Sequence, residues 1–348
     1  MTHPGANASA AEIGQWLRRD ATKICIFGRE HIGDVVNITG AIGVIRRNCP
    51  NAQIAVAVGE RAASVLKNSP DFDLLIERPW NRTLANKLKY LWRLSRDHFD
   101  AAFLLDEARS HVRIARWAGI PTKVGVALPQ KRRRLTFSVP FDEDGHDSRD
   151  QSIRLLEALE FEDVDPAPRL FPSGDDMRRA AAIVDRVVRP IVLIHPGASE
   201  PTRRWPGEHY ASVINELGVA SVTTILTGSP AERPLCDSIA GLTEAHPTIL
   251  TDLSILGFAA LAARADAVLV GDTGPMHVAA AVGTPVVALY GPTYPHRTGP
   301  YGGRHQIIQG PCSCVVRDWQ ICTHACMRAI EPAQVVPAVL YAVSPANR

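Results

Sequence analysis

The sequence lacks the two glycine-rich motifs that most often mark nucleotide-phosphate sites. After the first predicted strand, residues 28–34 read Gly-Arg-Glu-His-Ile-Gly-Asp, which is not the Gly-x-Gly-x-x-Gly turn of dinucleotide-binding domains. A Gly-x-x-x-x-Gly-Lys-Ser/Thr loop is also missing. The two absences argue against a nicotinamide-dependent enzyme and against a P-loop protein.

Long hydrophobic runs and a strong charge imbalance are absent as well. No run of about 18 apolar residues occurs, so nothing in the sequence is expected to span a membrane. Lys and Arg number 38 against 36 Asp and Glu, a net charge of +2, which does not mark a nucleic-acid binder. Seven cysteines, an odd number, do not resemble a secreted disulfide framework.

The first residues lack the basic and apolar regions of a signal peptide. We therefore expect a cytoplasmic protein whose residues 1–22 are flexible. Residues 16–19, Trp-Leu-Arg-Arg, are too short to decide whether they form a small interfacial helix. Peripheral contact with the inner face of the membrane stays open, and the sequence does not specify an oligomeric state.

What the sequence does contain is a regular alternation of strands and helices. With 348 residues, 46% of them apolar, the chain is long enough for two domains. The alternation predicts an α/β protein of two Rossmann-like, doubly wound parallel-sheet domains facing across a cleft. The expected strands are residues 23–27, 53–58, 72–76, 101–105, 123–126, 191–194, 222–226, 267–270 and 286–289.

The alternation stops once, in a segment rich in proline and aspartate. Residues 166–176 are the expected linker, between an N-terminal domain at 23–165 and a C-terminal domain at 177–330. Residues 331–348 contain apolar residues at helical spacing, which predicts a final helix. The helix either crosses back to the N-terminal domain or caps the C-terminal sheet.

Residues 271–281 carry the most informative motif. They follow an apolar strand and open a helix of small residues with Pro275 in its first turn. Free backbone N–H groups and the positive end of the helix dipole make such a helix start an anion site. Asp272, Thr273 and His277 surround it, and these side chains suit a ligand with phosphates and sugar hydroxyls.

Three further positions are candidates for chemistry. Asp34 lies in the first strand-to-helix turn, where it is either a general base or the N-cap of its helix. Arg203 and Arg204 follow a glycine turn and suit a diphosphate, although a solvated basic loop is the alternative. Glu232 is either a ribose ligand or an acid in the first turn of a helix.

These motifs together resemble glycosyltransferase family 9, the heptosyltransferases. The resemblance is carried, in order along the chain, by residues 32–35, 195–199, 203–206, 272–277, 289–293, 297 and 299–302. It implies a GT-B fold whose N-terminal half binds the acceptor and whose C-terminal half binds the nucleotide-sugar. It also implies inverting, metal-independent transfer of heptose from ADP-heptose to a lipopolysaccharide core.

The resemblance assigns roles by position. It makes Asp34 the catalytic base. Arg203 stands where the family commonly has lysine, which keeps the charge but changes the geometry. The implied donor-binding residues are Ser199, Arg203, Arg204, Glu232, Asp272, Thr273, Gly274, Pro275 and His277.

Two features are ambiguous. Cys312, Cys314, Cys322 and Cys326 are four thiols within a short segment and form a weak candidate for a zinc or iron centre, with packing cysteines or a disulfide as the alternative. Because the implied mechanism needs no cofactor, we expect no required metal. The run Lys131, Arg132, Arg133 and Arg134 is either a solvated surface or a weak acceptor site for an anionic glycolipid.

Other functions stay open at this point. The chain could use another nucleotide-sugar, or a protein or polysaccharide acceptor. A nucleotide-sugar-binding protein without catalysis and a sugar-nucleotide epimerase are compatible with the same fold. The acid at Asp34 argues for catalysis.

Overall fold

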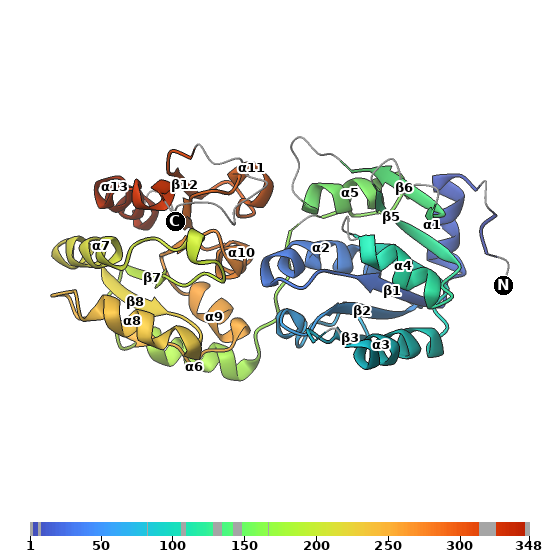
Figure 1. Cartoon of the computed structure of the whole chain (residues 1–348), viewed down its shortest axis with the longest axis horizontal. Coiled ribbons are helices and arrows are strands. Elements are labelled where there is room, and N and C mark those ends of the chain that lie inside the picture. The colour runs from blue at the N-terminus through green and yellow to red at the C-terminus, as the bar shows by residue number, and fades with distance from the viewer. Residues whose placement is uncertain are drawn as a thin grey trace. The chain divides into compact units, whose positions relative to one another are not determined.

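A computed structural model describes residues 3–5, 8–81, 83–105, 109–127, 134–141, 148–165, 167–312 and 325–344. The chain divides into two compact units, residues 1–169 and 170–348 (Figure 1). The boundary falls inside the predicted linker.

Unit 1 is built on a parallel sheet of six strands in the order β3-β2-β1-β4-β5-β6. Its strands alternate with helices, as the sequence predicts. The elements are α1 (Ala10–Arg19), β1 (Lys23–Phe27), α2 (Ile32–Asn48), β2 (Gln53–Gly59), the 3-10 turn η1 (Ala63–Leu66), β3 (Leu74–Arg78), α3 (Leu84–Arg96), β4 (Ala101–Leu104), α4 (Arg109–Trp117), β5 (Thr122–Ala127), β6 (Phe137–Pro140) and α5 (Ser148–Ala158).

Unit 2 repeats this plan. Its sheet has the order β12-β11-β10-β7-β8-β9, so the first strand of each unit lies beside the second and fourth strands of that unit. The elements are α6 (Gly174–Val184), β7 (Ile191–His195), η3 (Pro201–Arg203), α7 (Gly207–Val219), β8 (Thr223–Thr227), η4 (Pro230–Glu232), α8 (Arg233–Ala240), β9 (Thr248–Leu250), α9 (Ile255–Ala262), β10 (Ala267–Gly271), α10 (Gly274–Ala281), β11 (Val286–Tyr290), α11 (Pro295–Thr298), β12 (Gln306–Gln309), α12 (Ala325–Arg328) and α13 (Pro332–Val343).

Both sheets are covered on both faces, which explains why their strands are continuous apolar runs. In unit 1, Cys25 and Phe27 of β1 pack with Tyr90 and Leu94 of α3, while α2 and α5 contact each other. In unit 2, α7, α8 and α13 share a core with the sheet. The sequence patterns missed the short strands β6, β9 and β12, because each has only three or four residues.

The predicted flexible segment 1–22 contains a packed helix. Ser9 and Glu12 form a capping box at the start of α1, and Ile13 and Leu17 are completely buried. Trp16 is buried as well, so this helix does not offer an interfacial tryptophan. The prediction of a flexible segment overlooked the Ser-x-x-Glu signal, which satisfies two backbone N–H groups reciprocally.

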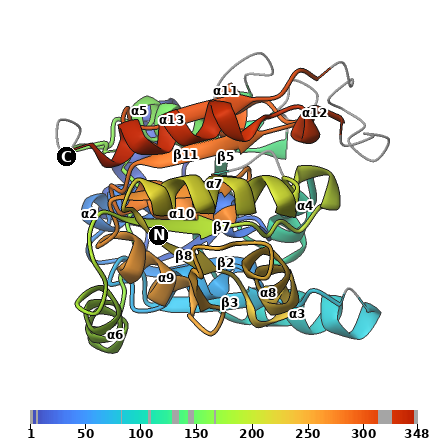
Figure 2. The same ribbon diagram turned by 90° about the vertical axis from the view of Figure 1, so that its left-hand side faces the viewer.

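The final helix covers the sheet of its own unit. Helix α13 contacts α7, β10, β11 and β12, and Figure 2 shows it alongside α7. Val335 and Val339 are fully buried in the core of unit 2. Of the two alternatives from the sequence, the structure has the helix that caps the C-terminal sheet. No helix in the described ranges is long and apolar enough to cross a membrane.

Candidate active site

The carboxyl edge of the unit 2 sheet gathers most of the predicted donor residues. Strand β7 ends at His195, and Val270 of the neighbouring strand β10 is its partner in the register. The chain runs from β7 outward to β8 and β9 and then returns to β10 on the other side. This reversal is a topological switch point, where open α/β sheets bind their ligands.

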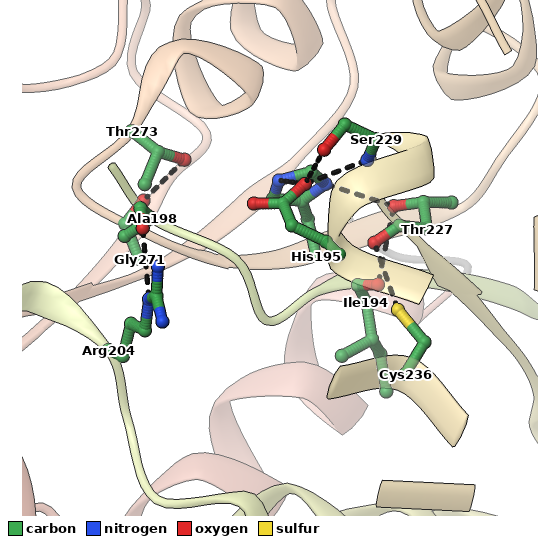
Figure 3. Close-up of polar contacts among 10 residues, drawn as sticks. Ile194, His195, Ala198, Arg204, Thr227, Ser229, Cys236, Gly271 and Thr273 are labelled. Atoms are coloured by element: carbon green, nitrogen blue, oxygen red, sulfur yellow. Dashed lines mark hydrogen bonds and ion pairs between the residues drawn. The ribbon is translucent and has the colours of Figure 1, made fainter. Parts of the chain in front are cut away.

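The two arginines predicted to hold phosphate lie at this edge. The Nη1 atom of Arg203 is 3.5 Å from Oδ2 of Asp272, and Nε of Arg204 donates to the carbonyl of Ala198 at 2.9 Å (Figure 3). Nε of Arg203 and Oδ2 of Asp272 are buried without a hydrogen-bond partner among the described residues. Buried polar groups that lack hydrogen bonds are rare and costly, which favours a ligand at this edge.

Helix α10 begins beside this ion pair and leaves its first turn without a side-chain cap. Thr273 is its N-cap residue and makes no capping bond. The hydroxyl group of Thr273 instead donates to the carbonyl of Gly271 at 3.4 Å. Gly274 and Pro275 open the helix, and His277 is buried within it. Pro275 has no N–H and the Met276 N–H donates to the carbonyl of Thr273 at 3.1 Å, so a ligand at this helix start would meet the N–H of Gly274 and the positive end of the helix dipole.

A buried histidine and a glutamate form a second cluster at the same edge. The carboxylate Oε2 atom of Glu232 accepts the backbone N–H of Ser229 at 2.7 Å and its hydroxyl at 2.8 Å. This atom also lies 3.9 Å from Nε2 of His195, while Nδ1 of His195 is 3.4 Å from the Thr227 hydroxyl. Figure 3 shows His195, Thr227 and Ser229 converging. Glu232 thus has the structural capping role that the sequence left open.

Glycine at position 197 makes room for this glutamate. A Cβ atom there would lie 1.9 Å from Oε1 of Glu232, far inside van der Waals contact. The hydrogen bonds from Ser229 go to Oε2, so the two carboxylate oxygens have different surroundings. The glycine turn of residues 195–199 therefore serves to seat Glu232 as well as to bend the chain.

Burial sets the protonation of this pair. Burial lowers the pKa of His195, and the nearby Glu232 offsets this only in part. Burial raises the pKa of Glu232, but hydrogen bonds from Ser229 and the charges of His195 and Arg204 outweigh it, so this pKa lies below its ordinary value. Near neutral pH the cluster is therefore a carboxylate beside a neutral imidazole.

Two other residues of the predicted motifs have distinct environments. Ser199 is exposed on the loop after β7. Trp205 is buried, donates its indole N–H to the carbonyl of Ile330 at 2.9 Å and packs edge-on against Tyr210. Trp205 is thus a packing anchor, and it holds the arginine loop against α7.

In unit 1, Asp34 occupies the first turn of α2 at the carboxyl edge of that sheet. The N-cap of α2 is His31, without a side-chain capping bond, so the interpretation of Asp34 as the N-cap is wrong. The Asp34 carboxylate lies 3.9 Å from Nη1 of Arg29, and both side chains are partly exposed. An accessible carboxylate at the start of a helix is placed where a general base could reach a bound hydroxyl group.

A buried polar cluster fixes the loop that leads to Asp34. Glu30 is 3.2 Å from the Nη2 atom of Arg78, and Nη1 of Arg78 also contacts His111. A Cβ atom at Gly59 would lie 2.7 Å from the Glu30 side chain. The sequence patterns do not predict this cluster. The sequence feature that could have indicated the cluster is Arg78, a charged residue two positions after the predicted strand 72–76.

The helices differ in whether a side chain caps their first turn. Helices α1, α3, α6 and α9 begin at Ser9, Thr83, Ser173 and Ser254, whose side chains accept a backbone N–H. Helices α2, α7 and α10 begin at the candidate edges and have no side-chain cap. Uncapped helix starts are ready-made anion sites.

Part of the predicted site lies outside the described residues. Lys131, Arg132 and Arg133 are among these, whereas Arg134 is described and exposed. Cys314 and Cys322 also fall outside, while Cys312 is partly buried and Cys326 is buried. No group of metal-ligating side chains occurs within the described part of the chain. The metal and acceptor interpretations of these segments stay predictions.

Comparisons with solved structures give the fold. A family 9 glycosyltransferase from Veillonella parvula superimposes with a TM-score of 0.82 at 22% identity, covering 92% of this chain and 97% of that one. The ADP-heptose lipopolysaccharide heptosyltransferase II of Escherichia coli gives 0.73 at 23% identity, covering 92% and 98%. The chain therefore has the GT-B fold.

Sequence comparison gives the family. The lipopolysaccharide core heptosyltransferase OpsX of Haemophilus influenzae is 27% identical over 298 residues, covering 82% of this chain and 83% of that protein. The profile of glycosyltransferase family 9 (heptosyltransferase) matches residues 88–323. This match spans about half of unit 1 and most of unit 2. It includes the arginine loop, the Glu232 cluster and the α10 edge. The chain is a glycosyltransferase and belongs to glycosyltransferase family 9.

Proposed function

We propose that the chain transfers a heptose from ADP-heptose to the core of a lipopolysaccharide, with inversion at the anomeric carbon. One observation carries the proposal: Arg203, Arg204 and the uncapped start of α10 gather at the switch point of the unit 2 sheet. Guanidinium groups and helix N-termini are the groups that bind diphosphates. The similar proteins are heptosyltransferases, which supports heptose as the sugar.

Unit 2 would hold the donor. Arg203 and Arg204 would bind the diphosphate, and Asp272 with Thr273 would contact the sugar and phosphates. Ser199, His277 and the Gly274-Pro275 turn complete the proposed donor site. Glu232, seated by Gly197 and capped onto Ser229, would accept hydrogen bonds from the ribose hydroxyls. Its low pKa keeps it an acceptor near neutral pH.

Unit 1 would supply the base. Asp34 takes the proton of the acceptor hydroxyl while that oxygen forms a bond to the anomeric carbon of the heptose. The bond from the anomeric carbon to the diphosphate breaks, and ADP leaves with the electron pair. The arginines and the α10 helix dipole stabilise the charge that develops on ADP. These groups can perform the role that a divalent cation has in other transferases.

The acceptor is expected to be anionic. Arg134 is exposed and ends the basic run that begins at Lys131, in the unit that carries Asp34. A cluster of like charges attracts an anionic ligand over distances of about a Debye length. Residues 131–134 are therefore a weak candidate site for the anionic acceptor.

Two measurements in sequence test the function. Thermal shift against ADP, UDP and GDP should single out ADP, since a ligand at 100 times its dissociation constant adds about 2.7 kcal/mol to the free energy of unfolding. Mass spectrometry after incubation with ADP-heptose and a lipopolysaccharide-core acceptor should then show the acceptor plus one heptose. Preference for another nucleotide, transfer to a protein or another polysaccharide, binding without turnover, or isomerised free sugar would each overturn the proposal.

A further inference from the structure

Helix α3 has two apolar faces, and only one of them is buried. Tyr90 and Leu94 pack in the core of unit 1. Leu84, Leu88 and Trp92 are 72%, 57% and 61% exposed. These three residues are spaced by four, so they form one stripe along the helix. A stripe of two leucines and a tryptophan facing solvent is costly unless something covers it.

The borders of this stripe are basic. Residues 84–96 include Lys87, Lys89, Arg93 and Arg96 and no acidic residue. At about 100° per residue, Lys87 and Lys89 fall on opposite sides of the stripe, and both are exposed. The Arg96 guanidinium lies 5.4 Å from the Trp92 ring. The surface therefore combines an apolar centre with a positive rim.

The segment before the helix extends this surface. Trp80 is 43% exposed, and the guanidinium of Arg61 stacks over its ring at 3.5 Å. The Asn86 side chain donates to the backbone carbonyl of Asn81 at 2.9 Å, which holds this segment against the first turn of α3. Tryptophan with a cationic neighbour thus occurs at both ends of the stripe.

We propose that α3 is a docking helix for an anionic lipid bilayer. Leucine and tryptophan enter the boundary between headgroups and acyl chains, while long lysine and arginine side chains reach back to lipid phosphates. The negative surface of the bilayer complements Lys87, Lys89 and Arg96, which border the stripe. Arg93 instead donates to the carbonyl of Leu75 at 3.3 Å. A second copy of this chain would place like-charged helices against each other, which the charge pattern disfavours. The inference goes beyond the proposed function and does not depend on it.

Flotation of the full chain with vesicles tests the proposal. We expect binding to vesicles of phosphatidylcholine and phosphatidylglycerol in about a 2:1 ratio and little binding to phosphatidylcholine alone, because the basic rim needs anionic headgroups. Equal binding to both, or no binding to either, would overturn the proposal. These vesicles contain no sugar acceptor, so the result is independent of the glycosyl-transfer proposal.

Variants separate the apolar and the basic contributions. L88Q/W92Q should weaken vesicle binding at least roughly tenfold, and K87Q/K89Q should weaken it roughly 30-fold. The control V188S/V219S removes two exposed valines of unit 2, which are 75% and 90% exposed, and should bind like the unchanged chain. Circular dichroism checks that each variant folds. Unchanged binding of both α3 variants would refute the docking helix.

The position of Trp92 gives a direct signal. Brominated phospholipid should quench tryptophan fluorescence in the unchanged chain, and W80F/W92F should lose most of this quenching while still binding vesicles. Sedimentation velocity tests whether a second copy of this chain covers the stripe instead. A dimer that L88Q/W92Q converts to a monomer would assign the stripe to self-association and contradict the proposal.

Discussion

The two units share one frame but differ in what they place at its carboxyl edge. Each has six parallel strands whose first strand lies beside the second and fourth. In unit 1 a short loop, residues 28–31, leads from β1 to Asp34 in α2. In unit 2 a longer loop, residues 196–206, leads from β7 to α7 and carries Arg203 and Arg204. The shared sheet topology predicts where a ligand binds, whereas the residues of the loop after the first strand determine which groups face that ligand.

The carboxyl edges of the two units nevertheless share one packing feature. Each unit seats a glutamate against a glycine, Glu30 on Gly59 and Glu232 on Gly197. In unit 1 the glutamate pairs with Arg78, whereas in unit 2 it caps a helical turn beside His195. We therefore expect unit 1 variants to change turnover and unit 2 variants to change donor affinity.

The largest effect is expected at Asp34. D34N should reduce turnover by roughly 10²–10⁴-fold, because the amide cannot take the acceptor proton. The dissociation constant for ADP, measured by calorimetry, should stay unchanged. D20N, at an exposed aspartate after α1, is the control. Near-normal turnover of D34N would reduce Asp34 to an acid that stabilises the first turn of α2.

The arginine loop is expected to show the opposite behaviour. R203A/R204A should weaken ADP binding by roughly 10–100-fold or more, since each charge-assisted hydrogen bond contributes about 1.5–3 kcal/mol. Binding of adenosine should change little. R178A/R179A on α6, whose side chains pair with Asp175 and Asp252, controls for lost charge. Equal losses for ADP and adenosine would argue against contact with phosphate.

Gly197 and Gly59 each pack against a glutamate, so the same substitution can be compared in the two units. G197A should displace Glu232, because its Cβ would lie 1.9 Å from Oε1, and should weaken nucleoside binding about tenfold. G59A should displace Glu30 and lower turnover while ADP affinity is kept. A Cβ at Gly303 meets open space, so G303A is the control. If G59A weakened ADP binding as much as G197A does, the proposed division, in which unit 1 controls turnover and unit 2 controls donor affinity, would be wrong.

A smaller effect concerns acid stability. Burial lowers the pKa of His195 below its ordinary 6.5, so the unfolded chain binds the proton more readily than the folded chain does. This contribution to the free energy of unfolding is present above pH 6.5 and is lost as the pH falls through and below that value. Urea unfolding between pH 8 and about 5 should show this loss.

The variant H195N should flatten this dependence on pH, since no imidazole is left to titrate. H246N is the matched control, because His246 is exposed and its positive φ is tolerated by asparagine. If H195N and the unchanged chain lose stability in parallel, other groups control the acid response.

No change at all is expected from a chelator. Transfer rates should survive EDTA, since arginines and a helix dipole stabilise the leaving ADP. A loss of rate that magnesium or manganese restores would contradict this mechanism. Elemental analysis of the purified protein separately tests the four-cysteine interpretation for residues 312–326.

The sequence alone predicts the frame and the strand ends well but not the contacts around them. The parallel strands β1, β7 and β10 are uninterrupted apolar runs, so they and the motifs that follow them could be located. The Arg203–Asp272 and His195–Glu232 contacts join residues far apart in the chain. Local patterns do not report such pairs, and the Glu30–Arg78–His111 cluster was missed for the same reason.

Helices α1 and α3 show where burial differs from what the local sequence pattern predicts. The burial of α1 was missed because its ends are polar, although Ser9 and Glu12 signal a helix start. The exposed stripe of α3 has the opposite character, since Leu84, Leu88 and Trp92 look like core residues in the sequence but face solvent. Periodicity identifies an apolar face without identifying what covers it.

The uncapped helix starts have a consequence for protein engineering. A serine, threonine or aspartate at an N-cap stabilises a helix by about 1 kcal/mol, so substitutions at His31 or Pro206, the N-caps of α2 and α7, would look attractive in a search for thermostable variants. The added side chain would occupy the N–H groups that an anionic ligand needs. Gains in melting temperature at these positions should therefore come with losses in activity.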